Sequence, residues 1–427
     1  MVVAVLTAVM TLGCASPISV PPETPPTLPA STAPTPTMPS AGPHTDLMAG
    51  YKAHDVALRA PDAGFQQAMA DFSISLLQQR VSERDNVLIS PLSVELALAM
   101  TANGAAGETL TQMQKVLGGG ASIDDINAML TSYVKGLPST DNARFHFADS
   151  IWFKQMDGFD VKPEFLQTNA DYYAAGVFAA PFDEGTINAI NAWVSKNTDG
   201  MIPSILDELN PSERVVLLNA LAFDAKWLQP YHDYQVGDDF FTASSGVRQP
   251  AKFMQSTEYT YLDDGRATGF VKPYADGVYN FVALLPNEGV AIKDYVASLT
   301  GDGWLRAMGS ATGDMVLAQL PEFSFSYGTS LVDALKNMGM PIAFDWATGD
   351  FSRMSDGVTN ISRVEHRTFI DVTPLGTRAG AATAVIIESG AVQPPDLIVT
   401  LDRPFVFAIT DAATNLPIFI GVTNSIA

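Results

Sequence analysis

Side chains that commonly perform catalysis or bind metals are scarce in this sequence. The chain has five histidines and one cysteine. No histidine stands at the spacing of a metal site or in the context of a catalytic nucleophile. The sequence therefore predicts no catalytic group, no metal site and no cofactor site. The histidines are His44, His54, His146, His232 and His366.

An unusual segment near the C-terminus suggests chemistry of another kind. Phe369–Phe405 begins and ends with strand-like sequence, but its middle part, Gly376–Val385, consists almost entirely of small residues. A solvated connection of this length is normally polar, and loops beyond about 12–15 residues without structure of their own are usually functional or disordered. Small side chains suit a segment that later slides between two existing strands.

The alternation of side chains along this segment is consistent with such an insertion. Side chains of a strand point to opposite faces in turn. If Thr377 faces the core, every second residue after it does too, and Arg378, the one charged residue in Gly376–Val385, faces outward.

Further motifs, in a fixed order along the chain, carry a resemblance to a known family. From about residue 60 onward the chain resembles the serpins, protease inhibitors that trap their target by inserting a loop into a β-sheet. The matching motifs are Asn86–Ser93 with Gly104–Thr109, Val216–Trp227, Leu320–Phe323 with Leu335–Met340, Ala343–Asp345 and Asp350–Ser352, and His366 with Arg403–Phe405.

The resemblance implies a suicide-substrate mechanism. The target protease supplies the catalytic serine, which forms an acyl-enzyme with the bait residue of an exposed reactive-centre loop. The cleaved loop then enters the central sheet and distorts the attached protease before hydrolysis. The inhibitor itself is not an enzyme under this interpretation. Some members of the family also trap cysteine proteases.

Counting from the hinge, as the resemblance implies, places the bait bond at Gly390–Ala391. Glycine is a poor bait residue, so Ser389 and Glu388 stay open as alternatives. Small residues suit proteases of elastase-like or subtilisin-like specificity, which we favour, whereas Glu388 suits a glutamate-specific protease. No lysine or arginine occurs between residues 378 and 403, which disfavours trypsin-like targets.

Two residues at and beside the hinge that the resemblance implies depart from the family pattern. Pro374 replaces the hinge glutamate, and Glu322 replaces the lysine that would pair with it. Because proline cannot donate to a ladder, it must lie at a strand end or stay unpaired, and it either stiffens the hinge or stalls insertion. The predicted hinge residues are Pro374, Gly376, Thr377, Arg378, Ala379, Gly380, Ala381, Ala382 and Thr383.

Two more sites follow from the resemblance. Ser90, Ser93, Asn219 and His366 resemble the family's polar cluster below the centre of the sheet, which we call the shutter. Such groups can exchange hydrogen-bond partners as strands separate; the alternative is four unrelated polar residues satisfied by the backbone. Trp227 resembles the tryptophan at the top of the sheet, where insertion begins, and this region, with Glu322, is called the breach. The alternative for Trp227 is an ordinary core aromatic.

Composition narrows the choice of partners. The chain has 427 residues and a net charge of −22, and such acidity argues against nucleic-acid binding. A single cysteine allows no intramolecular disulfide. We expect a monomer whose partner is a serine protease.

The N-terminus predicts export. Met1–Gly13 is an apolar run too short to span a bilayer and typical of a signal peptide. It ends at Cys14, in a context that resembles a bacterial lipoprotein cleavage box, although Thr11 is atypical and no basic residue precedes the run. The alternatives are lipidation at Cys14, with anchoring to a membrane, and an ordinary signal peptide. We expect a secreted or lipid-anchored protein outside the cytoplasmic membrane.

We predict three regions: a signal peptide (1–14), a spacer rich in Pro, Thr and Ser (15–50) and a serpin-like domain (51–427). Helices lead and strands dominate later, which favours a single α+β domain. The resemblance adds a large central sheet, further sheets and eight or nine helices. Among the expected strands, Arg214–Lys226 is covered on both faces, and Val271–Pro286 and Asp314–Tyr327 are each continuous.

Two other functions stay open as alternatives. The first is a non-inhibitory serpin, which is a binding module or a plain protease substrate; Pro374 favours it and the small hinge residues disfavour it. The second is a hydrolase that uses Ser, His and Asp.

Overall fold

The structure is a computed structural model that describes residues 44–156, 159–173, 175–378 and 395–426. Nine α-helices occur within these ranges, in agreement with the expected eight or nine. They are α1 (Ala63–Arg80), α2 (Pro91–Ala102), α3 (Gly107–Gly118), α4 (Ile123–Gly136), α5 (Pro163–Tyr172), α6 (Glu184–Asn197), α7 (Ile292–Ser298), α8 (Gly301–Gly309) and α9 (Val332–Met338).

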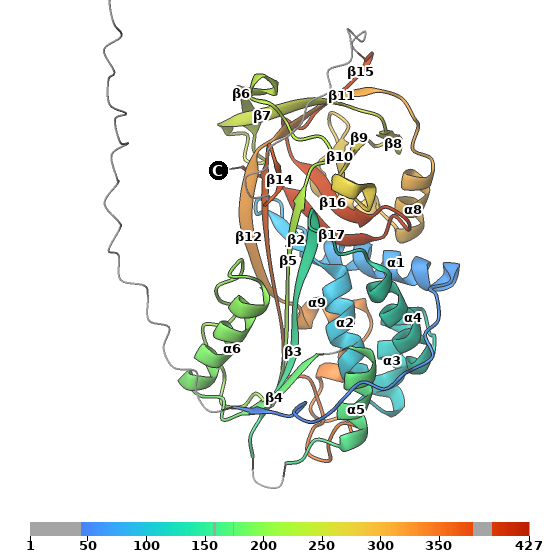
Figure 1. Cartoon of the computed structure of the whole chain (residues 1–427), viewed down its shortest axis with the longest axis vertical. Helices are drawn as coiled ribbons and strands as arrows, with labels where there is room; N and C mark the ends of the chain where they lie inside the picture. Colours follow the sequence, from blue (N-terminus) through green and yellow to red (C-terminus); the bar gives the residue numbers. More distant parts are fainter. Residues whose placement is uncertain (1–43, 157–158, 174, 379–394, 427) are drawn as a thin grey trace, which may run out of the picture. The chain divides into compact units, whose positions relative to one another are not determined.

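A seven-stranded sheet, here called the central sheet, runs along the molecule (Figure 1). Its strands are, in spatial order, β1 (Thr45–Asp46), β4 (Gly176–Ala180), β3 (Ala143–Lys154), β5 (Val215–Lys226), β14 (Gly376–Thr377), β13 (Arg363–Thr373) and β12 (Phe323–Ser330). The two residues of β1 lie within the range predicted as a spacer. The domain boundaries themselves stay a prediction.

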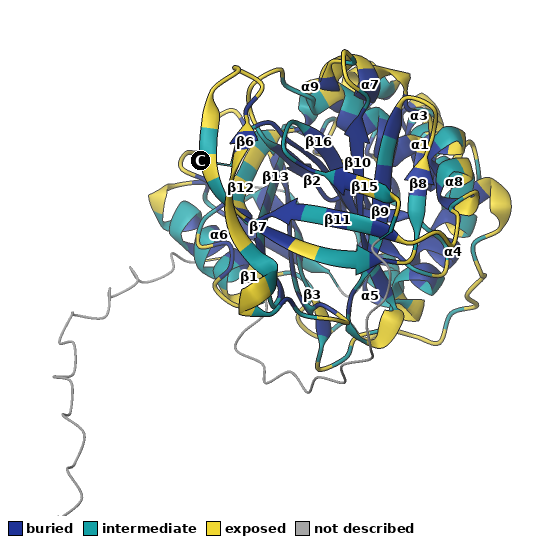
Figure 2. Cartoon of the chain, turned by 90° about the horizontal axis from the view of Figure 1, so that it is seen from above, coloured by how far each residue is buried: buried dark blue, intermediate teal, exposed yellow. Residues whose placement is uncertain are grey.

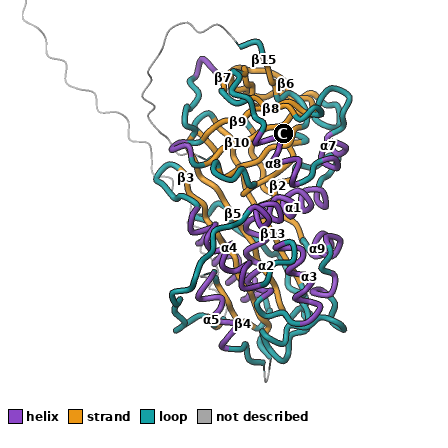
Figure 3. Tube along the Cα trace, turned by 90° about the vertical axis from the view of Figure 1, so that its right-hand side faces the viewer, coloured by secondary structure: helices purple, strands orange, loops and turns teal. Residues whose placement is uncertain are grey.

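Two smaller sheets complete the fold. The six-stranded sheet contains β2 (Val87–Ile89), β17 (Pro417–Thr423), β16 (Phe405–Asp411), β10 (Tyr279–Pro286), β9 (Ala267–Pro273) and β8 (Tyr261–Asp263). The four-stranded sheet contains β15 (Leu397–Thr400), β11 (Val316–Pro321), β7 (Arg248–Glu258) and β6 (Val236–Thr242). Figure 3 shows α2–α5 and α9 gathered at one end and the strands β6–β10 and β15 at the other.

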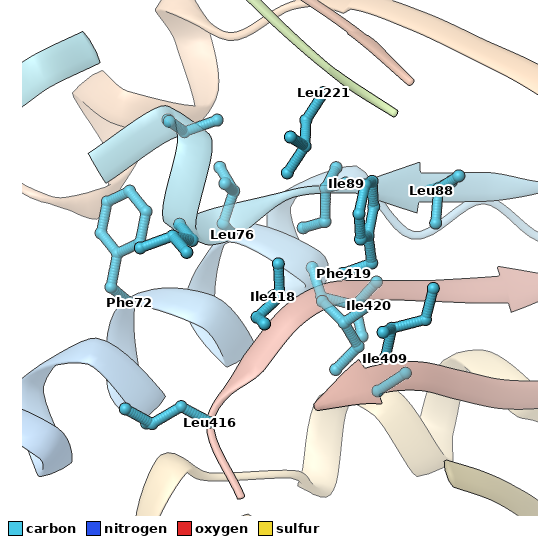
Figure 4. Close-up of a cluster of buried hydrophobic side chains, with 14 of the residues drawn as sticks. Phe72, Leu76, Leu88, Ile89, Leu221, Ile409, Leu416, Ile418, Phe419 and Ile420 are labelled. Carbon is cyan, nitrogen blue, oxygen red and sulfur yellow. The ribbon is translucent and has the colours of Figure 1, made fainter. Parts of the chain in front are cut away.

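The central sheet is buried on both faces, as the apolar sequence of β5 predicts. Alternate residues of β5, such as Val216 and Leu218, pack with α6 on one face. Leu217 and Leu221 face the main core on the other. Figure 4 shows part of this core, which contains Leu221 of β5, Phe72 and Leu76 of α1 and the isoleucines of β17. Buried residues follow the inner strands, and exposed residues follow loops, outer helix faces and the edge strands β6 and β12 (Figure 2).

Local sequence signals explain several element boundaries. The Ser90 side chain accepts a hydrogen bond from the Ser93 backbone N–H at the start of α2, and Pro91 occupies the first turn, where its missing N–H costs nothing. α3 and α9 end at Gly119 and Gly339, whose positive φ angles of 62° and 118° suit glycine.

Two predicted strands were wrong in extent. Val271–Pro286 is a hairpin, because Asp276 and Gly277 both adopt positive φ and turn the chain between β9 and β10. Asp314–Tyr327 is divided at Glu322, so that β11 belongs to the four-stranded sheet and β12 to the central sheet. Within the described ranges, no helix combines the length and the apolar character needed to cross a membrane.

Candidate functional site

The chain turns back into the central sheet just before the reactive segment. After β13 ends, the two-residue strand β14 pairs antiparallel with β13 on one side and with β5 on the other. Further along, β5 and β13 pair directly and in parallel, from Arg363 opposite Val216 to Phe369 opposite Ala222. β14 therefore fills only the first two positions between strands that meet directly beyond it.

Pro374 lies where its missing N–H costs nothing. Thr373 pairs with Gly376, so Pro374 and Leu375 form the two-residue loop of a hairpin. This placement agrees with the expectation that the proline sits at a strand end. Its carbonyl oxygen accepts a hydrogen bond of 2.9 Å from the backbone N–H of Tyr231.

Trp227, which directly follows β5, forms hydrogen bonds to the same hairpin loop. Its indole Nε1–H donates to the carbonyl oxygen of Thr373 at 2.9 Å, and its backbone N–H donates to that of Leu375 at 3.0 Å. With the hydrogen bond from Tyr231, the three consecutive carbonyls of Thr373–Leu375 all accept hydrogen bonds from Trp227 or Tyr231. Trp227 is buried and stacks on Tyr274, with ring centroids 4.5 Å apart.

Thr377 faces the core, which meets the condition on which the alternation argument was based. Its side chain is only 1% exposed, and its hydroxyl shares a 2.6 Å hydrogen bond with the hydroxyl of Tyr274. Arg378 is half-buried, with its guanidinium 5.9 Å from the ring of Phe369 on the face that α6 covers. Arg378 has a positive φ of 46°, so the chain leaves the strand direction there.

A buried ion pair supports the tryptophan and the tyrosine. Lys272 Nζ lies 2.8 Å from Glu258 Oε1, and their side chains are 2% and 7% exposed. The ammonium also lies 4.3 Å from the Tyr231 ring centroid and 5.5 Å from that of Trp227. Burial alone would lower the pKa of Lys272, but Tyr231 and Glu258 outweigh it and raise that pKa. Sequence reasoning missed this pair.

Glu322, the other departure in this region, has no hydrogen bond or ion pair with the hinge residues that the structure describes, Pro374–Arg378. Its backbone N–H donates to the carbonyl of Lys252 at 2.8 Å. Burial raises the pKa of the Glu322 carboxyl, and the charge of Lys252 offsets part of that rise. Among the described residues, the hinge is held by hydrogen bonds from Trp227 and Tyr231 to its backbone carbonyls.

The four predicted shutter residues meet in one buried network. The backbone N–H of Ser90 donates to His366 Nε2 at 3.1 Å, which leaves the ring proton on Nδ1. Nδ1 donates to Asn219 Oδ1, and Asn219 Nδ2 in turn donates to the hydroxyl of Ser93. Burial lowers the pKa of His366 to about 3, so the ring is neutral at physiological pH. The histidine is a hydrogen-bond partner, as expected.

Several predicted site residues lie outside the described residues. They are Cys14, the hinge positions Ala379, Gly380, Ala381, Ala382 and Thr383, and the bait candidates Glu388, Ser389, Gly390 and Ala391. The described chain leaves the central sheet at Arg378 and resumes at Pro395, just before β15 of the four-stranded sheet. No group of three or more potential metal ligands occurs among the residues that the structure describes.

Comparison with known proteins assigns the family. A family model described as serpin (serine protease inhibitor) matches residues 67–426. The chain belongs to the serpin family. An uncharacterized serpin-like protein of Thermococcus kodakarensis is 28% identical over 379 residues, covering 86% of this chain and 87% of the relative. Serpins are generally non-catalytic protease inhibitors that act as suicide substrates.

Solved serpin structures agree in detail. The thermophilic serpin tengpin in its native state matches with a TM-score of 0.86 and 44% identity, covering 90% of this chain and 99% of tengpin. Its latent state matches with a TM-score of 0.77 and 41% identity, covering 87% and 100%. The better match to the native state is consistent with a strand β14 of only two residues.

One member of the serpin's polar cluster was missed from the sequence. Asp149 Oδ1 accepts hydrogen bonds from Ser93 Oγ at 2.8 Å and from Asn219 Nδ2 at 2.6 Å. Burial raises the pKa of Asp149 to about 8, although both hydrogen bonds act to lower it. A signal existed: Asp149 is the one acidic residue in Ala143–Lys154, a strand that the fold covers on both faces.

Asp149 is expected to make the stability of the native serpin depend on pH. Its pKa is higher in the folded state than in an unfolded chain, where it is about 3.9. The stabilisation from the bound proton is therefore complete below about pH 4 and is lost as the pH rises to about 8. The loss is at most about 6 kcal/mol, and smaller because Asp149 is only partly buried by surface area.

The variant Asp149→Asn imitates the protonated carboxyl and should remove this loss. We expect its melting temperature to match that of the unsubstituted serpin near pH 4 and to exceed it by several degrees near pH 8. His366 contributes equally to both proteins, since its stabilisation is present above about pH 6.5 and lost toward pH 3. A difference in melting temperature that does not change with pH would contradict the assignment.

The Lys272–Glu258 pair is expected to be essential for the breach. Replacing Lys272 with methionine leaves the Glu258 carboxylate buried without its cation, at a cost of about 3–5 kcal/mol. Thermal unfolding should show this as a clear drop in melting temperature. A double variant, Lys272→Met with Glu258→Leu, should recover most of the drop because no charge is left unpaired. A double variant that melts no higher than Lys272→Met would refute this explanation.

Proposed function

We propose that this serpin inhibits a serine protease as a suicide substrate. The supporting observation is β14: the hinge has begun a strand between β5 and β13, with Thr377 buried, while the two strands still pair directly beyond it. Parting them would admit a strand antiparallel to both neighbours, with its backbone hydrogen bonds gained on each side. A strand of about 14 residues would carry an attached protease about 45 Å.

The bait bond is proposed at Gly390–Ala391, with Ser389 and Glu388 as the alternatives. Small residues on either side of this bond fit proteases with small specificity pockets, such as elastase-like and subtilisin-like enzymes. The acyl-enzyme forms between the protease serine and the bait residue, and insertion of the released segment distorts the protease before water can attack.

A panel of proteases tests this proposal. The purified serpin would be incubated with an elastase, a subtilisin, a glutamyl endopeptidase and trypsin, and analysed on denaturing gels with mass spectrometry of the released C-terminal peptide. We expect a denaturant-resistant complex with the elastase or the subtilisin and a peptide that begins at Ala391. Cleavage by every enzyme except trypsin without any complex would contradict inhibition.

A non-inhibitory serpin is the second candidate, and Pro374 with Glu322 supports it. The described hinge has backbone hydrogen bonds but no ion pair to regulate its opening. In this case the chain would be cleaved in the same segment without forming a complex. A variant that restores the pair, Pro374→Glu with Glu322→Lys, separates the two: it should begin to trap only if the hinge chemistry limits insertion.

We further propose that Cys14 is lipidated and that the residues between Cys14 and β1 tether the serpin domain outside the cytoplasmic membrane. The apolar run before Cys14 and the proline-rich stretch after it support this arrangement. Expression of the full chain and of Cys14→Ala in a bacterium, followed by membrane fractionation, tests it. The full chain should sediment with membranes and the variant should not.

A further inference from the structure

A pocket of about 300 Å³ lies beside the shutter, between β3, α4, α6 and the segment that follows α5. Its walls are mostly apolar and aromatic, and its volume is at the lower end of small-molecule sites. The lining includes Met100, Val134, Phe147, Asp149, Tyr173 and Trp193. Phe147 and Asp149 are two residues apart on β3 and therefore point to the same face of the strand.

The carboxyl of Asp149 is the polar feature of this pocket. It is partly exposed there, and its hydrogen bonds from Ser93 and Asn219 both end on Oδ1. Within the described part of the chain, no lysine, arginine or histidine forms an ion pair with it; Lys135 lines the pocket but makes no such contact. A carboxyl group that is held in an aromatic pocket and has no counter-ion favours binding of a cationic ligand.

We propose that this pocket binds a small aromatic amine, with the ammonium group on Asp149 and the ring against Phe147 and Trp193. A protonated amine supplies the positive charge that the site lacks, and aromatic faces attract cations as well as rings. The volume admits one ring with a short chain. Above about pH 8, where Asp149 is ionised, a carboxylate ligand would meet it with like charge, and a neutral ligand would leave the carboxylate unpaired.

Binding of such an amine is coupled to loss of a proton. Because burial raises the pKa of Asp149 to about 8, the carboxyl is mostly protonated at pH 6–7. The cation binds the ionised form, so each amine bound at that pH displaces close to one proton. Affinity should rise roughly tenfold per pH unit below about pH 8 and level off above it.

The pocket also connects to the strands that must part. Asp149 on β3 accepts a hydrogen bond from the Asn219 side chain on β5. Asn219 Oδ1 in turn accepts a hydrogen bond from His366 Nδ1 on β13. An ionised Asp149 forms a stronger hydrogen bond with the Asn219 amide than a protonated one does. The more polarised amide then binds His366 more strongly, which strengthens the hydrogen bond between β5 and β13. Bound amine should therefore slow strand separation. This last step rests on the proposed function, whereas binding itself does not.

Isothermal titration of the full chain with benzylamine tests the proposal, with benzyl alcohol and benzoate as neutral and anionic counterparts. Above about pH 8, where Asp149 is ionised, we expect saturable binding of benzylamine, at least roughly tenfold tighter than either counterpart. Two buffers with different ionisation enthalpies should report release of about one proton near pH 6.

Three variants locate the site. Asp149→Asn should weaken benzylamine at least roughly tenfold and abolish proton release, and Val134→Trp should block the pocket without touching the polar network. Asp263→Asn, in a separate pocket beside α8, should change nothing. Equal affinity for benzylamine and benzyl alcohol, or Asp149→Asn and Val134→Trp variants that are folded and bind benzylamine normally, would overturn the proposal whether or not the serpin inhibits a protease.

Discussion

Under the proposed inhibitory function, replacing Thr377 with arginine is expected to make this serpin a substrate that is cleaved without trapping its protease. The Thr377 side chain is buried between β5 and β13 and bonded to Tyr274. An arginine there would be an unpaired charge in the core, so we expect the hinge of the variant to leave the sheet in the native state. Insertion would then have to bury the charge again, at a cost of several kcal/mol. If insertion slows by about 3 kcal/mol, its rate falls on the order of a hundredfold. The acyl-enzyme would then hydrolyse before the strand forms.

The number of inhibitor molecules consumed per protease inactivated measures this effect. This number equals one plus the ratio of hydrolysis to trapping, so it should rise by up to about a hundredfold, while the rate of cleavage in the reactive segment stays similar. Arg378→Thr is the matched control, because Arg378 lies on the other face and is half-buried; its stoichiometry should stay within about twofold. Efficient trapping by Thr377→Arg, or an equal loss in both variants, would refute the insertion geometry.

Replacing Asn219 with leucine is expected to destabilise the native serpin more than any other single change in the shutter. Asn219 holds His366, Ser93 and Asp149 at once. Without it, buried donors and acceptors lose their partners, and each costs about 1–3 kcal/mol. The melting temperature should fall by on the order of 10 °C. Conversion to a loop-inserted form on mild heating should also become faster.

Thr368→Val is the matched control for this loss. Thr368 is also buried on β13, but its hydroxyl makes one hydrogen bond, to the carbonyl of Leu88 at 2.8 Å. Its removal should cost about 1 kcal/mol. If the two variants melted at the same temperature, Asn219 would be an ordinary buried residue and the network would have no special role.

Much of the fold was readable from the sequence, because local pattern and long-range packing agree there. The apolar run of β5 and the helix stops at Gly119 and Gly339 are examples. The hairpin at Asp276-Gly277 was missed although its dipeptide is a strong turn signal. The division at Glu322 has no local signal of similar strength, since two strands of different sheets follow one another almost without a gap.

The residues of the candidate site that belong to a sequence motif could be predicted. The residues that meet only through packing could not. Ser90, Ser93, Asn219 and His366 were proposed together on the strength of the resemblance, and the structure brings them into contact. Tyr231, Lys272 and Glu258 lie on different segments that meet only in the folded chain. No sequence pattern relates them, so their support of the hinge could be found only from the structure.

Under the proposed mechanism, β5 and β13 part after cleavage and accept the reactive segment as a new strand between them. The most direct measurement is the melting temperature before and after a single cleavage within residues 386–394. A strand of about 14 residues paired on both sides should add on the order of 10 kcal/mol, which predicts a rise of roughly 20 °C or more. A cleaved form that melts at or below the temperature of the intact serpin would contradict the claim.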